Sequence, residues 1–151
     1  MKSFITVALL TMSSLSFAAT SATLQLKGTI LQALDISIVP ESVATSLNLT
    51  QTASNLKVAV ISEKSNSNTG YKVTVSSLNN GKLKNGSQLF PYTLGYNSQN
   101  LNLNSPQTQT YSTIQAYNVS KDVTISYTGI AQDALVAGDY VDTVTFTIAA
   151  N

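Results

Sequence analysis

The chain ends in Ala137-Gly138-Asp139-Tyr140-Val141-Asp142-Thr143-Val144-Thr145-Phe146-Thr147-Ile148-Ala149-Ala150-Asn151. Near its beginning lies a second alternating stretch, Ala22-Thr23-Leu24-Gln25-Leu26-Lys27-Gly28-Thr29-Ile30. Apolar residues recur at alternate positions in both stretches, which is the period of a β-strand with one buried face. We therefore expect a strand near each end of the chain. The first of them is free to pair either within its own domain or with another copy of the chain.

The first eighteen residues are typical of a secretory signal peptide. Lys2 supplies a positive charge, and Phe4 to Leu10 form an apolar run that is too short to span a bilayer. Small residues at Ser16 and Ala18 predict cleavage after Ala18. A membrane anchor is disfavoured because no long apolar stretch follows. The remaining residues, 19–151, are enough for one domain with a substantial core.

The composition argues against several classes of function. Without Lys2, seven Lys balance seven acidic residues, and the chain contains no Arg, so we expect no nucleic-acid partner. Cys and His are absent, which removes disulfides, the commonest metal ligands and the usual acid–base residues. No Asp-x-Asp-x-Asp pattern suggests calcium. We predict no metal, no cofactor and no catalytic residue, and hence that the protein is not an enzyme.

Short alternating or apolar segments separated by polar turns run along the rest of the chain. Abundant Val and Thr and the lack of a long helical stripe predict an all-β sandwich of seven or eight strands. Asn97 to Thr113 is polar and is either a long loop or a weak edge strand. The expected strands are Leu34–Ile38, Ser46–Thr50, Leu56–Ile61, Gly70–Val75, Leu89–Tyr96, Val119–Tyr127 and Tyr140–Ile148.

A few polar and aromatic residues are candidates for chemistry or ligand contact. Asp139 and Asp142 are three positions apart near the start of a strand, so they are expected to point to opposite faces and to be solvated. Tyr111 and Tyr117 lie in polar surroundings and are the better candidates for surface contact among the tyrosines. Neither pair predicts a catalytic site.

The C-terminal stretch carries a more specific signal. Its Ala-Gly-x-Tyr-x-Asp-x-Val pattern followed by alternating Thr and apolar residues resembles the last strand of bacterial chaperone–usher pilins and of related spore coat protein U domains. Gly70-Tyr71-Lys72-Val73 is similar to a middle strand of that family. The resemblance implies an incomplete immunoglobulin-like β-sandwich (residues 32–151) with an N-terminal donor strand (residues 19–31).

The same resemblance implies partners, a location and site residues. A periplasmic chaperone would first cap the incomplete sandwich and hold the carboxylate of Asn151, and an outer-membrane usher would then join identical or related subunits. The product would be a fimbrium on the cell surface that supports adhesion or biofilm formation. The implied donor residues are Ala22, Leu24, Leu26, Gly28 and Ile30. The implied walls of the acceptor groove are Leu34, Ile36, Ile38, Tyr140, Val144, Phe146 and Ile148.

Two features depart from that family, and one alternative function stays open. Many pilins carry a disulfide near the first strand, and many have an aromatic residue where this chain has Ala150. These departures favour a divergent branch. The alternative is a self-contained secreted β-sandwich that binds a ligand, with carbohydrate as one candidate. A hydrolase is disfavoured by the absence of His and Arg.

Overall fold

The computed structural model describes residues 20–151, so the predicted signal peptide lies outside the described residues. Thr20–Ile30 contains no helix or strand, and Leu31–Asn151 forms a compact β domain. The strands are β1 (Leu34–Pro40), β2 (Ala53–Ser65), β3 (Tyr71–Ser77), β4 (Lys82–Asn85), β5 (Gln88–Pro91), β6 (Thr93–Tyr96), β7 (Gln99–Leu101), β8 (Gln107–Tyr111), β9 (Tyr117–Tyr127) and β10 (Val144–Ala150). Two short 3₁₀ helices, η1 (Ser42–Thr45) and η2 (Gln132–Ala134), interrupt them.

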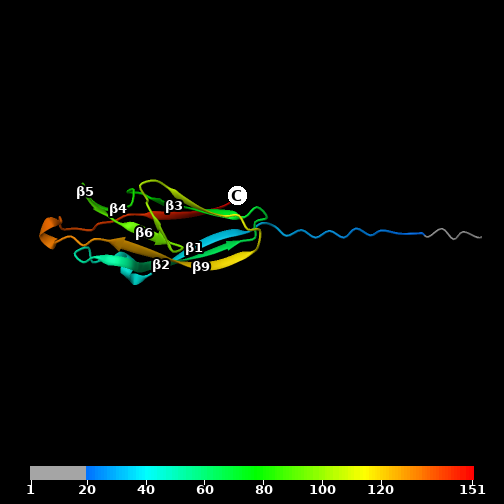
Figure 1. The fold of residues 1–151 in the computed structure, drawn as a ribbon, viewed down its shortest axis with the longest axis horizontal. Coiled ribbons are helices and arrows are strands. Elements are labelled where there is room, and N and C mark those ends of the chain that lie inside the picture. Colours follow the sequence, from blue (N-terminus) through cyan, green and yellow to red (C-terminus); the bar gives the residue numbers. More distant parts are fainter. Residues whose placement is uncertain (1–19) are drawn as a thin grey trace, which may run out of the picture. The chain divides into compact units, whose positions relative to one another are not determined.

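The strands form antiparallel sheets in a sandwich-like arrangement, which confirms the all-β prediction. The larger sheet has the order β1-β2-β9-β6-β7, and the second has the order β10-β3-β8. Figure 1 shows β2 and β9 in one layer and β3 in the other. The hairpin of β4 and β5 is attached to the chain before β10 by a bridge between Lys84 and Val141.

The core lies between the two main sheets, where their alternating residues meet. Ile61 and Val123 come from the larger sheet, and Val73 and Val75 come from β3. Each is almost fully buried, as expected for the inward half of a strand with period two. A second apolar cluster around Phe90 fills the end of the sandwich near η2.

Two sequence predictions about strands are wrong in detail. Ser46–Thr50 is not a strand, because the Asn48 side chain accepts a hydrogen bond from the Thr50 amide at 3.1 Å and closes a turn. The predicted strand Leu89–Tyr96 is divided at Tyr92 into β5 and β6. For the polar segment Asn97–Thr113, the edge-strand alternative is confirmed, because the segment contains β7 and β8, each at the end of its sheet.

A charged and aromatic network is buried on one side of the core. The Glu63 carboxylate is fully buried and accepts hydrogen bonds from the hydroxyls of Tyr71 and Tyr96. It also pairs with the Lys121 ammonium at 2.7 Å, and that ammonium lies 3.9 Å from the centre of the Tyr111 ring. Glu63 thus has both a countercharge and hydrogen-bond donors, as a buried charge requires.

The network changes the titration of its tyrosines. Burial raises the pKa of Tyr71 and of Tyr96 well above its ordinary value near 10, and the hydrogen bond to the Glu63 carboxylate adds to the effect. Both hydroxyls are therefore held as neutral hydrogen-bond donors over the physiological pH range.

Candidate functional site

Each main sheet ends in a strand with one unpaired side. Within residues 20–151, β1 is paired with β2 alone and β10 with β3 alone. The two strands also lie near each other. We call their unpaired sides together the β1–β10 edge. A strand edge of this kind presents backbone donors and acceptors that another strand can use.

The backbone groups that β10 presents at this edge follow from its pairing with β3. The Asn151 amide donates to the Gly70 carbonyl at 3.4 Å, so residue 151 directs its backbone toward β3. Because antiparallel strands alternate, the other odd-numbered residues do the same and the even-numbered ones face away. Val144, Phe146 and Ile148 therefore direct their N–H and C=O groups to the open side, where the described residues supply no partner.

The same reasoning applies to β1. The Glu41 amide donates to the Val58 carbonyl at 2.8 Å, which places the backbone groups of the odd-numbered residues on the β2 side. Leu34, Ile36 and Ile38 then direct their backbone groups to the open side. On both strands, the residues with free backbone groups are the apolar ones.

The side chains of these residues are not fully covered by the domain. Leu34, Ile36, Val144, Phe146 and Ile148 pack against the main core, yet each is only half-buried. Ile38 keeps 49% of its surface exposed. The predicted groove residues on these two strands are thus brought together at one edge. The edge has the chemistry to accept an extended segment with an apolar face.

Tyr140 lies elsewhere, and the predicted strand Tyr140–Ile148 is wrong at its beginning. β10 starts only at Val144, and Tyr140 packs in the second cluster, with its ring centre 6.5 Å from that of Phe90. The chain is diverted because the backbone of Val141 pairs with Lys84 of β4 rather than with β3.

The prediction that Asp139 and Asp142 are both solvated is wrong for Asp142. Asp139 is exposed as expected, but the Asp142 carboxylate accepts hydrogen bonds from the hydroxyls of Tyr92 and Ser77, each at 2.6 Å. It also accepts from the Asn79 amide at 3.0 Å. Asp142 therefore ties the segment before β10 to the end of β3 and to Tyr92, which lies between β5 and β6.

Tyr111 and Tyr117 are also placed differently from the prediction of surface contact. The Tyr111 ring stacks on Tyr71 with ring centres 4.7 Å apart, and Tyr117 meets the same ring edge to face at 5.1 Å. Their polar sequence surroundings concealed this role, because the partners come from other strands.

The predicted chaperone anchor, Asn151, lies beside the turn between β2 and β3. The hydroxyl of Thr69 donates to a terminal oxygen of Asn151 at 3.0 Å, and the side-chain amide of Asn151 donates to the backbone carbonyls of Thr69 and Tyr111. These contacts hold the end of β10 in place.

The predicted donor residues are strongly exposed. Leu24, Leu26 and Ile30 keep 83%, 85% and 90% of their surfaces accessible, and no atom lies within 4 Å of the position that a Gly28 Cβ would take. Leu24 and Leu26 are two positions apart, and Ile30 continues the same alternation beyond Gly28. Among the described residues 20–30, nothing covers the apolar face of the segment Ala22–Ile30.

Comparison with known proteins assigns no family to the chain. No protein-family model matches it, and no curated protein matches it. Among residues 20–151, no helix has the length and apolar character needed to cross a membrane. No cluster of three or more acidic, His or Cys residues that could hold a metal occurs in that same range.

Proposed function

We propose that this chain is a structural fimbrial subunit that polymerises by strand exchange. In this proposal the segment Ala22–Ile30 of one copy fills the β1–β10 edge of the next. One observation carries it: the edge exposes backbone groups and half-covered apolar side chains at the same residues, while the same chain contains an alternating segment with no strand partner. An extended segment added to a sheet edge pairs with the free backbone groups and also covers the apolar side chains.

The strand order supports an immunoglobulin-like sandwich that lacks one strand. Immunoglobulin domains place strands A, B, E and D in one sheet and C, F and G in the other. In their order within the sheets, β1, β2, β9 and β6 match A, B, E and D, and β3 and β10 match C and F. Strand G would lie beside β10, and that side of β10 is the open one.

The dimensions of the segment and the edge agree. β10 has seven residues, which span about 23 Å at ~3.3 Å per residue. The nine residues Ala22–Ile30 span about 30 Å when extended, so they cover the whole edge. Leu24 and Leu26 would then bury their side chains, and the small Gly28 would suit a shallow position. Burial of a Leu side chain contributes about 1.5–3 kcal/mol.

The geometry of the domain favours a partner copy over the chain's own segment. β1 begins and β10 ends at the turn after Ser65, where Asn66 bonds the Leu31 carbonyl at 3.0 Å and the Ala33 amide at 2.6 Å. A segment antiparallel to β10 must place Ile30 near the far end of that strand, about 20 Å away. The four residues from Ile30 to Leu34 reach at most about 14 Å, so only another copy can supply an antiparallel strand.

The proposal includes export and assembly partners. A periplasmic chaperone would cover the β1–β10 edge before assembly, and an outer-membrane usher would exchange it for the next subunit at the cell surface. No catalytic step is involved. The alternative, a self-contained binding module, requires the segment Ala22–Ile30 to pair in its own domain. Because the four residues from Ile30 to Leu34 are too short for an antiparallel arrangement, the segment would then run parallel to β10.

Cysteine cross-linking distinguishes these two arrangements, because the natural chain has no Cys. We expect the pair Thr23→Cys with Ala149→Cys to link different copies, since an antiparallel segment places residue 23 near the end of β10. The pair Thr23→Cys with Thr145→Cys tests the parallel arrangement within one chain. Both pairs use positions that alternate with the apolar residues, so the core is left intact.

The readout is a denaturing gel of protein from the cell surface, with and without heating. A heat-sensitive ladder in the unmodified chain, made covalent by the first pair, supports strand exchange, because complete strand pairing slows dissociation. A monomer in all lanes, with an intramolecular link in the second pair, would falsify the proposal and favour the self-contained module.

A further inference from the structure

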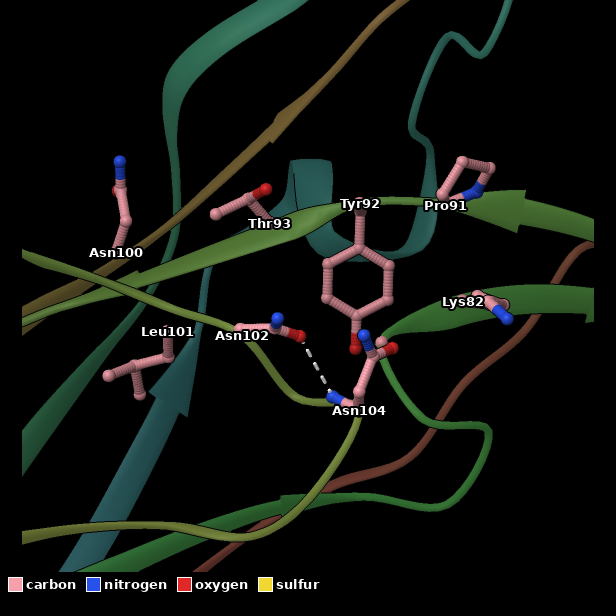
Figure 2. A pocket seen from close by; sticks show the side chains of 9 residues that line it. Lys82, Pro91, Tyr92, Thr93, Asn100, Leu101, Asn102 and Asn104 are labelled. Carbon is pink, nitrogen blue, oxygen red and sulfur yellow. Dashed lines mark hydrogen bonds between the residues drawn. The ribbon is translucent and has the colours of Figure 1, made fainter.

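A polar cleft lies where β4, β6 and β7 come together, at the opposite end of the larger sheet from β1. Its volume is about 450 Å³, which is within the range of small-molecule sites. Its lining includes Lys82 at the start of β4, Tyr92 just before β6, Thr93 at the start of β6, and residues on and after β7. Figure 2 shows the Tyr92 ring between Asn102 and Lys82.

Three asparagines line one side of this cleft at alternate positions. Asn100, Asn102 and Asn104 are exposed, whereas Leu101 and Leu103 between them are buried in the core. The buried leucines fix the segment, so the asparagines are presented together. The Asn104 backbone amide donates to the Asn102 side-chain oxygen at 3.1 Å.

These amides have unused hydrogen-bonding capacity. Within the described part of the chain, the side chains of Asn100 and Asn104 and the amide nitrogen of Asn102 form no hydrogen bond. Each amide group can donate and accept at once. A row of such groups matches a row of hydroxyls, which also donate and accept.

Tyr92 is held firmly in the cleft and presents part of its ring. Its hydroxyl donates to Asp142 at 2.6 Å, and its backbone amide donates to the Gly81 carbonyl at 3.1 Å. The ring is half-buried, so one part of it stays available to a ligand. Because the hydroxyl is already used, the ring offers an apolar surface of the kind that packs against C–H groups.

Lys82 is the charged residue of the lining. Its ammonium takes part in neither of the ion pairs found among residues 20–151, which are Lys57–Asp122 and Lys121–Glu63. A free ammonium beside hydroxyl-matching amides favours a ligand that carries a negative charge.

We propose that this cleft binds a saccharide that carries a carboxylate. The asparagine amides and the Thr93 hydroxyl meet the sugar hydroxyls, the Tyr92 ring packs against the C–H face of the sugar, and Lys82 pairs with the carboxylate. The function is separate from assembly, because the cleft shares no residue with the β1–β10 edge.

The test is calorimetric titration of the mature protein, in whichever assembly state it is isolated, with two probes. Trigalacturonate carries the carboxylates, and galactotriose is its neutral counterpart. The variants are Lys82→Gln and Asn102→Ala. Their matched controls are Lys84→Gln on the same strand and Asn118→Ala on β9, both of which remove an exposed side chain outside the cleft.

We expect trigalacturonate to bind more tightly than galactotriose. Lys82→Gln should weaken trigalacturonate binding about tenfold, which is about 1.4 kcal/mol, and Asn102→Ala should weaken the binding of both sugars. The controls should bind as the unmodified chain does. The proposal is overturned if neither sugar binds, if only the neutral sugar binds, or if Lys84→Gln weakens binding as much as Lys82→Gln does.

Discussion

Phe146 of β10 and Tyr96 of β6 meet edge to face, with ring centres 5.4 Å apart and planes inclined by 63°. The Tyr96 hydroxyl bonds the buried Glu63 carboxylate, and Phe146 is one of the residues whose backbone faces the β1–β10 edge. Phe146 at the β1–β10 edge is therefore in contact with Tyr96, which belongs to the buried charged network. A change in that network is expected to be felt at the edge.

The first prediction concerns the segment Ala22–Ile30. Replacing Leu24 and Leu26 by Asp should abolish polymers, because two carboxylates would have to be buried in the partner's edge without a countercharge. Capture by the chaperone should persist, since the domain itself is unchanged. The measurement is the heat-sensitive ladder on a gel, together with co-purification of the chaperone.

The matched control for this segment uses its polar face. Thr23→Asp with Gln25→Asp adds the same charge at alternating positions and should still give polymers, because these side chains would face solvent. Equal loss of polymers in both double variants would mean that charge, rather than the buried face, blocks assembly.

The second prediction concerns Phe146. Phe146→Ala should lower the free energy of unfolding by about 2 kcal/mol, because full burial of Phe is worth about 3–5 kcal/mol and this ring is half-buried. Chemical denaturation of the mature protein measures the change. Thr147→Ala, on the exposed face of the same strand, should change it by less than about 0.5 kcal/mol. Similar losses in both variants would contradict the assigned inner face.

The third prediction concerns the buried pair of Glu63 and Lys121. Glu63→Gln should destabilise the domain by about 3 kcal/mol, because the ammonium of Lys121 stays largely buried without its countercharge. Adding Lys121→Met to that variant should restore part of the loss. Denaturation of the two single variants and the double variant gives the coupling energy. Additive losses would show that the pair is not coupled.

The fourth prediction concerns alkaline pH. The folded-state pKa values of Tyr71 and Tyr96 are raised above 10, so folding favours their neutral forms. The stability that they contribute is complete below pH 10 and should fall as the pH rises above it, because the unfolded chain releases these protons first. Denaturation between pH 8 and pH 12 measures the drop in the free energy of unfolding, with each protein compared with its own value at pH 8. This drop should be smaller for Tyr96→Phe than for the unmodified chain. A profile as steep as that of the unmodified chain would refute the assignment.

Several strands could be predicted from the sequence because their pattern is local. Tyr71, Val73 and Val75 alternate with polar residues and are fully buried on β3, as expected. Leu34 and Ile36 likewise face the core from β1. A period of two is a property of the strand itself, so it can be recognised in the sequence without knowledge of the neighbouring strands.

Other features were missed because they depend on distant partners. The ion pair of Glu63 and Lys121 joins residues 58 positions apart, and nothing near either residue in the sequence indicates the other. Ser46–Thr50 alternates like a strand, yet the Asn48 side chain closes a turn there. The alternation of Asn100, Asn102 and Asn104 is visible in the sequence, but the sequence does not show that these residues line one cleft with Lys82.

The sequence by itself determined the all-β class and the inward faces of the main strands, because alternation and turn residues act over a few positions. It also showed the alternating apolar residues of Ala22–Ile30. The tertiary structure alone decided which strands lack a neighbour and which polar groups are buried together. It also decided that Tyr140 and Asp142 lie outside β10, which begins at Val144. Those outcomes depend on hydrogen bonding and packing between segments that are far apart in the chain, and no local pattern encodes them.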